Sequence, residues 1–325
     1  MRAIQLDCYA CFKMFQIALI GYGYWGQKIA RHLGRFTLKT ICDTSLDRLQ
    51  EAQRDFKDVQ VTPSIATVLG DPEIQAVLII TPVNTHYALA KQALLANKHV
   101  FVEKPLGACL VQAQELYTLA KQRQKILHCD LTFIYSAPIR WIQENLGMLG
   151  DVLSITSRRL GGICREDTNI LYDLGLHDLS ILSFFYPNAL CAVTHPTLHQ
   201  TSHPSHPTPT STYLNFYLPT PKPTPVSINL SWLSPFKVRD MLIMGTQNTL
   251  YYNDNAPNPI ALYPTTLTPQ QPSPHHPPLN PSSALSNCLE SFYEGILNTT
   301  PCPQQERIIL DALGFLEEIE GACPS

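Results

Sequence analysis

The chain has 325 residues, 45% of them hydrophobic, and a formal net charge of −3. This length suits two domains with buried cores, and the slight acidic balance argues against nucleic acid or another polyanion as a partner. No apolar run reaches the length of a transmembrane helix, so we expect no membrane partner either.

The N-terminal residues add little to the expected function. Residues 1–13 precede the first strand pattern and are interpreted as an extension, with Met14 as a candidate true start. Cys8 and Cys11 form a CxxC without a second cysteine pair, so we expect no metal site. The ten cysteines are scattered without a paired framework, which is typical of free thiols in the cytoplasm.

Strand and helix patterns alternate from residue 16 to residue 130. Short, almost continuous apolar runs are separated by amphipathic stretches, which is typical of βαβ units around a parallel sheet covered on both faces. We therefore predict an α/β fold that begins with a Rossmann domain over 14–128. The predicted strands are 17–21, 38–43, 59–62, 76–81, 99–104 and 125–130, and the predicted helices are 24–35, 45–56, 86–97 and 109–123.

The pattern changes after residue 130 and predicts a second domain over 129–325. Runs of period two favour a mostly antiparallel open sheet with one exposed face, which suggests a homodimer or homotetramer. The proline-rich segments 194–210 and 219–225 are predicted loops, and their histidines lack the spacing of metal ligands. Strands are predicted at 150–160, 211–218, 226–233, 239–246 and 249–253, and helices at 136–147, 169–185, 283–297 and 303–320.

The turn after the first predicted strand has the sequence GYGYWG. Gly21, Gly23 and Gly26 match G-x-G-x-x-G, in which the glycines allow a tight turn, close approach to a pyrophosphate and close packing of strand and helix. The turn follows a strand and opens a helix, which is the context of a dinucleotide site. Tyr24 and Trp25 belong to the same turn and are candidate cofactor contacts.

Other polar residues follow the next predicted strands. Asp43 ends the second strand, where a carboxylate binds the adenosine ribose and repels a 2′-phosphate, so NAD is favoured over NADP. TPVNTH follows the fourth strand. It is expected to line the cofactor's path, and Asn84 or Thr85 could at the same time cap the following helix. The candidate cofactor contacts in this turn are Thr81, Pro82, Asn84 and His86.

Two further patterns could move protons. Glu103-Lys104-Pro105 ends the fifth strand, where a lysine in a partly dry cleft can shuttle a proton, although a surface ion pair has the same pattern. Asp173 and His177 are four residues apart on a predicted helix and so share one face. A carboxylate beside an imidazole raises its pKa and orients it, but a structural pair has the same spacing. Asp178 points elsewhere and is interpreted as structural.

The chain resembles the glucose-fructose oxidoreductase / inositol dehydrogenase (Gfo/Idh/MocA) family of NAD(P)-dependent sugar oxidoreductases. The resemblance lies in GYGYWG, ICD, TPVNTHYALAKQALLANKHVFVEKPL and LYDLGLHDLSIL. It implies that Lys104 is the catalytic lysine of the EKP tripeptide and that Glu103 contacts the nicotinamide-side ribose. It also implies that Asp173 and His177 flank the reacting hydroxyl, with Asp173 orienting His177.

The segment from Leu131 to Leu182 resembles the branch of this family that oxidises nucleotide-linked amino sugars at C3, although Gly175-Leu176 departs from the branch pattern. The resemblance implies NAD-dependent oxidation of a UDP-linked N-acetylamino sugar for surface glycans. The alternatives are a dehydrogenase of a free sugar or inositol, and a regulatory protein that binds NAD without turnover. The candidate substrate contacts are Tyr135, Arg158, Arg165 and Asn169.

Overall fold

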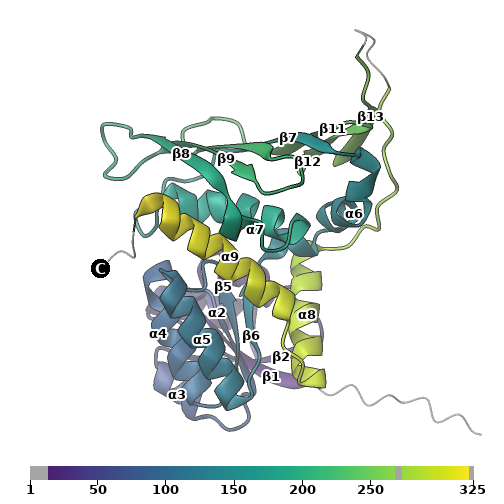
Figure 1. Cartoon of the computed structure of the whole chain (residues 1–325). Coiled ribbons are helices and arrows are strands. Elements are labelled where there is room, and N and C mark those ends of the chain that lie inside the picture. The colour runs from purple at the N-terminus through teal and green to yellow at the C-terminus, as the bar shows by residue number, and fades with distance from the viewer. Residues whose placement is uncertain (1–13, 268–272, 322–325) are drawn as a thin grey trace, which may run out of the picture.

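The computed structural model describes residues 14–267 and 273–321. Figure 1 shows two lobes, a lower one around a parallel sheet and an upper one around a broad second sheet. Cys8 and Cys11 lie outside the described residues. Within the described ranges, no helix combines the length and the apolar character needed to cross a membrane.

The first sheet has six strands in the order β3-β2-β1-β4-β5-β6, all parallel. Its central strand β4 is buried along its whole length because helices cover both faces of the sheet. The strands are β1 (Phe15–Ile20), β2 (Phe36–Cys42), β3 (Gln60–Thr62), β4 (Ala76–Ile79), β5 (His99–Glu103) and β6 (Leu127–Asp130). The helices are α1 (Tyr24–Ala30), α2 (Leu46–Asp55), α3 (Ile65–Gly70), α4 (Val83–Leu95) and α5 (Leu110–Arg123).

The predicted Rossmann domain is confirmed, with small differences at its helices. Helix α1 ends at Ala30, five residues before the predicted end at 35, with Arg31 as its C-cap. Helix α3 has six residues and was not predicted, because so short an element carries almost no periodic signal. Ser45 and Ser64 cap α2 and α3 through their side chains.

The second sheet has seven strands in the order β13-β12-β11-β7-β10-β9-β8. The pairing of β7 with β10 is parallel, and every other pairing is antiparallel, so the predicted, mostly antiparallel sheet is confirmed. The strands are β7 (Val152–Leu160), β8 (Thr194–Thr201), β9 (Ser211–Leu218), β10 (Thr224–Ser231), β11 (Val238–Gly245), β12 (Asn248–Asn253) and β13 (Ile260–Pro264).

The prediction of a loop over 194–210 is wrong for its first half. Residues Thr194–Thr201 form β8, which pairs with β9 at the edge of the sheet. An edge strand tolerates a proline because its outer N–H groups need no partner in the sheet, and β8 is almost wholly exposed. Because its sequence is polar and contains a proline, β8 was not recognised as a strand. Its pairing with β9 holds it in the sheet. Strand β13 was also missed.

Helices cover one face of the second sheet and return to the first domain. The long α9 crosses between the lobes, and α8 runs down beside β1 and β2 (Figure 1). Phe292 and Tyr293 of α8 pack against Phe36 of β2, with ring centroids 5.6 and 5.5 Å apart. The remaining helices are η1 (Thr132–Tyr135), α6 (Ala137–Asn145), η2 (Leu146–Leu149), the π segment η3 (Leu171–Gly175), α7 (Leu176–Phe185), η4 (Leu190–Ala192), α8 (Ala284–Asn298) and α9 (Pro303–Glu320).

Candidate active site

A cavity of about 780 Å³ opens at the carboxyl ends of β1, β2 and β4. The strand order reverses between β1 and β4, and ligands of open α/β sheets bind at such a point. Most of the predicted cofactor contacts line this cavity. They are Gly21, Gly23, Tyr24, Trp25, Asp43, Thr81, Pro82, Asn84 and Glu103.

The glycines of the turn are required by its geometry. Gly21 has φ +96°, and a Cβ there would lie 2.1 Å from the Ile80 carbonyl oxygen. A Cβ on Gly26 would lie 2.1 Å from the Gly21 carbonyl oxygen, so this glycine lets α1 approach the turn although it does not line the cavity. At Gly23 a side chain would enter the cavity itself. The turn therefore leaves bare backbone where a dinucleotide phosphate can approach.

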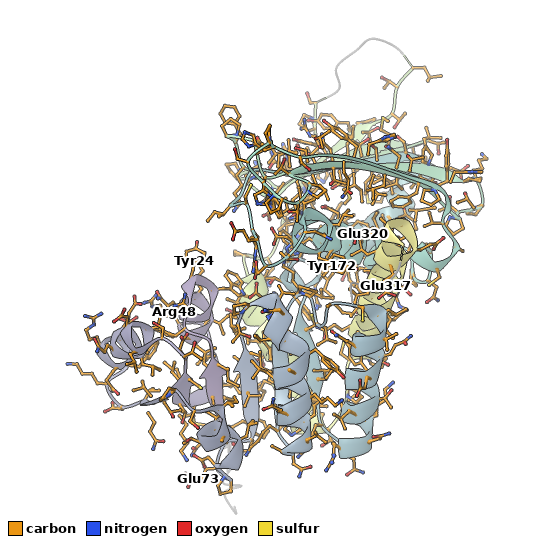
Figure 2. The ribbon with its side chains drawn as sticks, turned by 90° about the vertical axis from the view of Figure 1, so that its left-hand side faces the viewer. Tyr24, Arg48, Glu73, Tyr172, Glu317 and Glu320 are labelled. Atoms are coloured by element: carbon orange, nitrogen blue, oxygen red, sulfur yellow. The ribbon has the colours of Figure 1, made fainter. Side chains whose placement is uncertain are left out.

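Asp43 is held at the far side of this turn. Its carboxylate accepts hydrogen bonds from the backbone N–H groups of Tyr22 (2.7 Å) and Ser45 (2.8 Å), and the residue is buried. Arg48 lies beside it, with Nη1 3.6 Å from Oδ2, and lines the same cavity. Tyr24 and Arg48 lie at the end of the first domain that faces the second sheet (Figure 2). Arg48 was not predicted, although its place in the first turn of α2 follows directly from Asp43.

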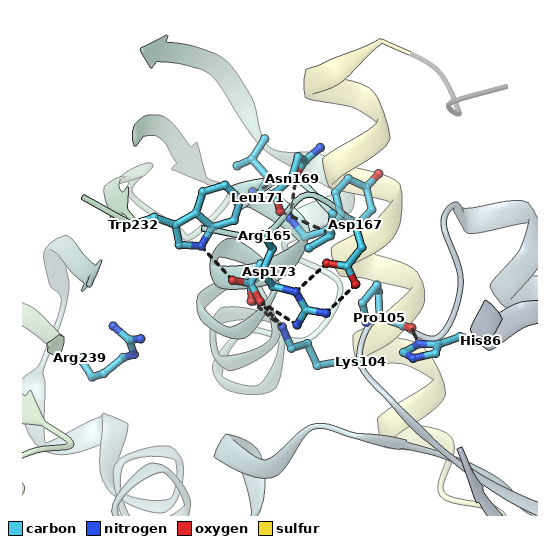
Figure 3. A network of polar contacts seen from close by, with 12 residues as sticks. His86, Lys104, Pro105, Arg165, Asp167, Asn169, Leu171, Asp173, Trp232 and Arg239 are labelled. Atoms are coloured by element: carbon cyan, nitrogen blue, oxygen red, sulfur yellow. Dashed lines mark hydrogen bonds and ion pairs between the residues drawn. The ribbon is translucent and has the colours of Figure 1, made fainter. Parts of the chain in front are cut away.

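His86 does not line the cavity, contrary to the prediction. It is fully buried, with Nδ1 2.8 Å from the Pro105 carbonyl oxygen and Nε2 2.7 Å from that of Thr81. His86 therefore ties the turn after β4 to the turn after β5 (Figure 3). Helix α4 begins at Val83 with Pro82 as its N-cap, so Asn84 and Thr85 do not cap it.

A second cavity of about 360 Å³ adjoins the first. Trp25 and Glu103 line both, so the two spaces share a wall. Lys104 and His177 line the second cavity, as predicted for residues near a reacting hydroxyl. The other lining residues are Asp130, Thr132, Phe133, Ser136, Asp254 and Ala284.

Lys104 is fixed by Asp173. Its Nζ donates to Asp173 Oδ1 (3.0 Å) and to the Asp173 carbonyl oxygen (2.6 Å), and both side chains are mostly buried. The second carboxylate oxygen of Asp173 accepts a hydrogen bond from Trp232 Nε1 at 3.0 Å, and Arg165 Nη1 lies 3.8 Å from Oδ1. Figure 3 shows these groups converging on Asp173. The ammonium group is thereby aimed from the end of β5 toward the second domain.

The prediction that Asp173 orients His177 is not supported by the contacts. Within the described residues no hydrogen bond joins the two side chains, and the His177 ring instead packs edge-on to Phe133 at 5.0 Å. The cause is local: Leu171–Gly175 forms a π segment, not the α-helix that the i,i+4 argument assumed. Gly175 ends this segment against the Leu230 side chain, where a Cβ would lie 3.0 Å away.

The surroundings of His177 and Asp173 shift the pKa values of both side chains. Burial, together with the positive charges of Lys104, Arg159 and Arg239, lowers the pKa of His177 well below its usual value, so the prediction that Asp173 raises this pKa is wrong. Burial alone would raise the pKa of Asp173, but Lys104 and Trp232 hold it below the usual value. The site at neutral pH therefore contains a neutral imidazole, able to accept a proton, beside a cation held by a carboxylate.

Glu103 gives a pH-dependent prediction. Burial raises its pKa from 4.5 to about 7. Because the folded chain binds this proton more tightly than the unfolded chain, stability falls as pH rises from about 4.5 through about 7, and the loss is complete above that range. Between about pH 5 and about pH 8, we expect the free energy of unfolding of Glu103→Gln to rise by about 2 kcal/mol relative to that of the wild type. This figure discounts the pKa shift for the partial exposure of the side chain. Urea unfolding across this range measures the difference. The exposed Glu166→Gln serves as the control, and parallel pH profiles for wild type and Glu103→Gln would contradict the prediction.

Two of the predicted substrate contacts, Tyr135 and Arg158, lie outside both cavities. Tyr135 is 3% exposed, and its hydroxyl accepts hydrogen bonds from Ser291 and Gln305 in the core. Arg158 lies on the open face of the second sheet, away from the cavity, where it forms a two-bonded ion pair with Asp240. Neither lines either cavity.

The other two predicted substrate contacts, Arg165 and Asn169, lie in the segment before Leu171. Asn169 Oδ1 accepts from the backbone N–H groups of Leu171 and Tyr172, so it caps the π segment, and its amide donates to Glu320. Arg165 lines the first cavity, where it pairs with Asp167 at 2.8 Å. Arg165 is thus placed nearer the cofactor space than the substrate space.

Besides Arg48, three further residues at or near the site were not predicted from the sequence. Asp130 ends β6 and accepts hydrogen bonds from Trp25 Nε1 (3.0 Å) and Thr132 Oγ1 (2.6 Å), so it links the glycine turn to the second cavity. Asp130 is a carboxylate at the end of a strand, like Asp43, and it could have been predicted as a site residue for that reason. Trp232 and Arg239 come from distant strands and carried no local signal.

The first domain matches a known family of redox enzymes. Residues 15–131 match the Gfo/Idh/MocA family, described as an oxidoreductase family with an NAD-binding Rossmann fold. The resemblance seen in the sequence is therefore confirmed, together with NAD as the type of cofactor. The turn, cavity and carboxylate described above fit a dinucleotide.

Individual relatives match only about half of this chain, at modest sequence identity. Residues of the chain are 36% identical over 190 residues to the uncharacterized oxidoreductase YdgJ of Escherichia coli, covering 53% of this chain and 54% of that protein. Identity is 28% over 195 residues (54% of each chain) with the scyllo-inositol 2-dehydrogenase (NADP(+)) IolW of Bacillus subtilis. It is 26% over 166 residues (50% and 51%) with UDP-N-acetylglucosamine 3-dehydrogenase of Acidithiobacillus ferrooxidans. The matches thus span about half the length of these relatives.

Solved structures share the fold over nearly the whole chain. KijD10, a 3-ketoreductase from Actinomadura kijaniata in complex with TDP-benzene and NADP, has a TM-score of 0.81 at 15% identity, covering 95% of this chain and 98% of that one. GenD2 from gentamicin A biosynthesis, in complex with NAD, has a TM-score of 0.80 at 18% identity, covering 95% and 93%. At such identities the likeness extends to the fold alone.

Proposed function

We propose that the protein oxidises a secondary hydroxyl of a sugar to a ketone with NAD. The favoured substrate is a UDP-linked N-acetylamino sugar that reacts at C3, in surface glycan synthesis. The observation that carries the proposal is the shared wall between the two cavities. Lys104 and His177 line the cavity that adjoins the dinucleotide space, so a hydroxyl placed between them would have its carbon facing that space.

The residues divide the proton chemistry between them. When bound, NAD supplies the acceptor for the hydride. The neutral His177 accepts the hydroxyl proton, because its lowered pKa keeps it unprotonated at neutral pH. Lys104, held by Asp173, donates a hydrogen bond to the same oxygen and stabilises the negative charge that develops on it. Trp232 and Arg165 hold Asp173 in place, so Asp173 positions Lys104 and not His177.

The choice of substrate class is supported by two relatives and opposed by one. The relative from Acidithiobacillus ferrooxidans acts on UDP-N-acetylglucosamine by its name, and KijD10 is a 3-ketoreductase with a TDP ligand. IolW carries an inositol name at similar identity, so dehydrogenation of a free polyol is the alternative.

An absorbance assay of NADH formation with a panel of UDP-sugars, free sugars and inositols tests the proposal. Activity with a UDP-linked N-acetylamino sugar alone supports it, and activity with a free polyol alone replaces the substrate. If no substrate gives NADH, even with 2-oxoglutarate present to reoxidise bound cofactor, the redox proposal fails and a regulatory role is favoured.

The preference for NAD over NADP can be tested at Asp43. Asp43→Asn removes the charge that repels a 2′-phosphate, and Arg48 is already close enough to attract one. We expect the ratio of NAD to NADP affinity to fall by about tenfold or more, a typical change for one charged contact. Fluorescence titration with each cofactor measures the ratio. Asp47→Asn, an exposed residue next to Arg48 in α2, should leave the ratio unchanged, and an equal ratio in both variants would contradict the role of Asp43.

A further inference from the structure

Two arginines face each other across neighbouring strands beside the site. Arg159 on β7 and Arg239 on β11 are directly paired in the antiparallel register. Paired side chains in this register share one face of the sheet, here the face covered by α7, because Arg159 bonds to Asp178 of that helix. Like charges placed directly opposite destabilise a sheet unless counter-charges balance them.

The balance is incomplete. Asp178 accepts hydrogen bonds from Nε and Nη2 of Arg159, but the buried Nη1 of Arg159 has no partner. Arg239 donates to the carbonyl oxygens of Leu160, Val238 and Gly161. Those bonds satisfy part of the guanidinium but bring no negative charge. Across residues 14–267 and 273–321, no carboxylate forms an ion pair with Arg239, although the residue is partly buried.

Neither arginine lines the second cavity, but the charges of both act on His177, which does. The Arg159 guanidinium carbon lies 4.4 Å from the centroid of the Phe133 ring, which itself packs on His177. The carbonyl oxygen of Arg239 accepts a hydrogen bond from the Asp254 N–H at 2.9 Å, and Asp254 lines the cavity. In Figure 3 the Arg239 side chain is set apart from the Lys104–Asp173–Arg165 network, on the side of Trp232.

We propose that Arg239 binds an anionic group of the substrate close to the reacting hydroxyl, with Arg159 adding positive potential from the opposite strand. The inference rests on the proposed function and deepens it, because it requires a charged sugar derivative and rejects free polyols. Arg239 Nε and one Nη2 hydrogen have no protein partner among the described residues, and they offer the two adjacent donors that a phosphate or carboxylate accepts. The group is either the phosphate of a nucleotide sugar or a carboxylate on the sugar itself.

Calorimetric titration of the NAD-loaded protein tests the inference without turnover. The probes are UDP-N-acetylglucosamine, which carries phosphate, glucuronate, which carries a carboxylate, and N-acetylglucosamine and myo-inositol, which carry neither. Arg239→Gln keeps a hydrogen-bond donor for the Leu160 carbonyl but loses the charge. We expect it to weaken binding of the charged probe by about 10- to 100-fold and Arg239→Lys to restore part of the loss. Whichever charged probe responds identifies the source of the anion.

The matched control is Arg158→Gln, because Arg158 is the neighbour of Arg159 on β7 but lies on the opposite face of the sheet. Light scattering first checks that all variants keep the native mass. Equal loss in Arg158→Gln and Arg239→Gln, unchanged binding in Arg239→Gln, or failure of the wild type to bind either charged probe would overturn the inference. The proposed function fails separately, through absent NADH formation, so a charge-dependent binding without turnover would keep the anion site and remove the redox proposal.

Discussion

Replacing Lys104 by Met is expected to lower kcat by about 10²- to 10³-fold, the usual cost of removing one donor that stabilises a developing negative charge. Lys104 lines the second cavity and not the dinucleotide cavity. The affinity for NAD should therefore change less than about threefold, which is less than the loss of one hydrogen bond typically causes. Methionine preserves the length of the side chain but cannot donate to the substrate oxygen. NADH formation under saturating substrate and fluorescence titration of NAD give the two numbers.

The fold should survive this substitution. Asp173 keeps its hydrogen bond from Trp232 and the nearby Arg165 when the ammonium group is removed. Lys222→Met removes a lysine from an exposed ion pair with Asp151 and should leave both numbers unchanged. Turnover in Lys104→Met within threefold of the wild type would remove Lys104 from the mechanism. Equal loss of turnover and of NAD affinity would make it a cofactor-binding residue.

The parts of the site that sequence predicts well are those built by neighbouring residues. The glycine turn and Asp43 lie within one βαβ unit, so their spacing already fixes their positions at one sheet edge. Lys104 and Asp173 are 69 residues apart, and their contact depends on how η3 packs on the end of β5. No local pattern contains that information. The family resemblance supplied both residues, but the prediction paired Asp173 with His177 and not with Lys104.

The wrong predictions have equally specific causes. Arg158 and Arg159 are adjacent on β7 and point to opposite faces, so the choice between them depended on the phase of the alternation. Ile155 is 1% exposed and faces the core, which places residues 157 and 159 on its side. A charged residue at an inward position is the more informative one, and Arg159 was available from this argument. The π segment at Leu171–Gly175 had no such signal in the sequence.

The buried pair of Arg159 and Asp178 leads to the largest expected effect on stability. Each side chain is 3% exposed, the Arg159 Nε lies 2.9 Å from Asp178 Oδ2, and Ser157 donates a hydrogen bond to Asp178. Asp178→Asn leaves the Arg159 charge buried without a counter-charge. We therefore expect the free energy of unfolding to fall by about 3 to 5 kcal/mol, as when one partner of a buried ion pair is removed. Urea denaturation measures it.

Two further variants separate the orphaned charge from the general effect of losing an acid. Asp151→Asn breaks an ion pair whose side chains are 62% and 78% exposed, and it should reduce stability by less than about 1 kcal/mol. The double variant Arg159→Met/Asp178→Leu removes both charges together and should recover most of the loss, because an apolar pair of similar size can replace a buried ion pair. If the double variant is as unstable as Asp178→Asn, the hydrogen bond from Ser157, and not charge balance, is what fastens α7 to the sheet.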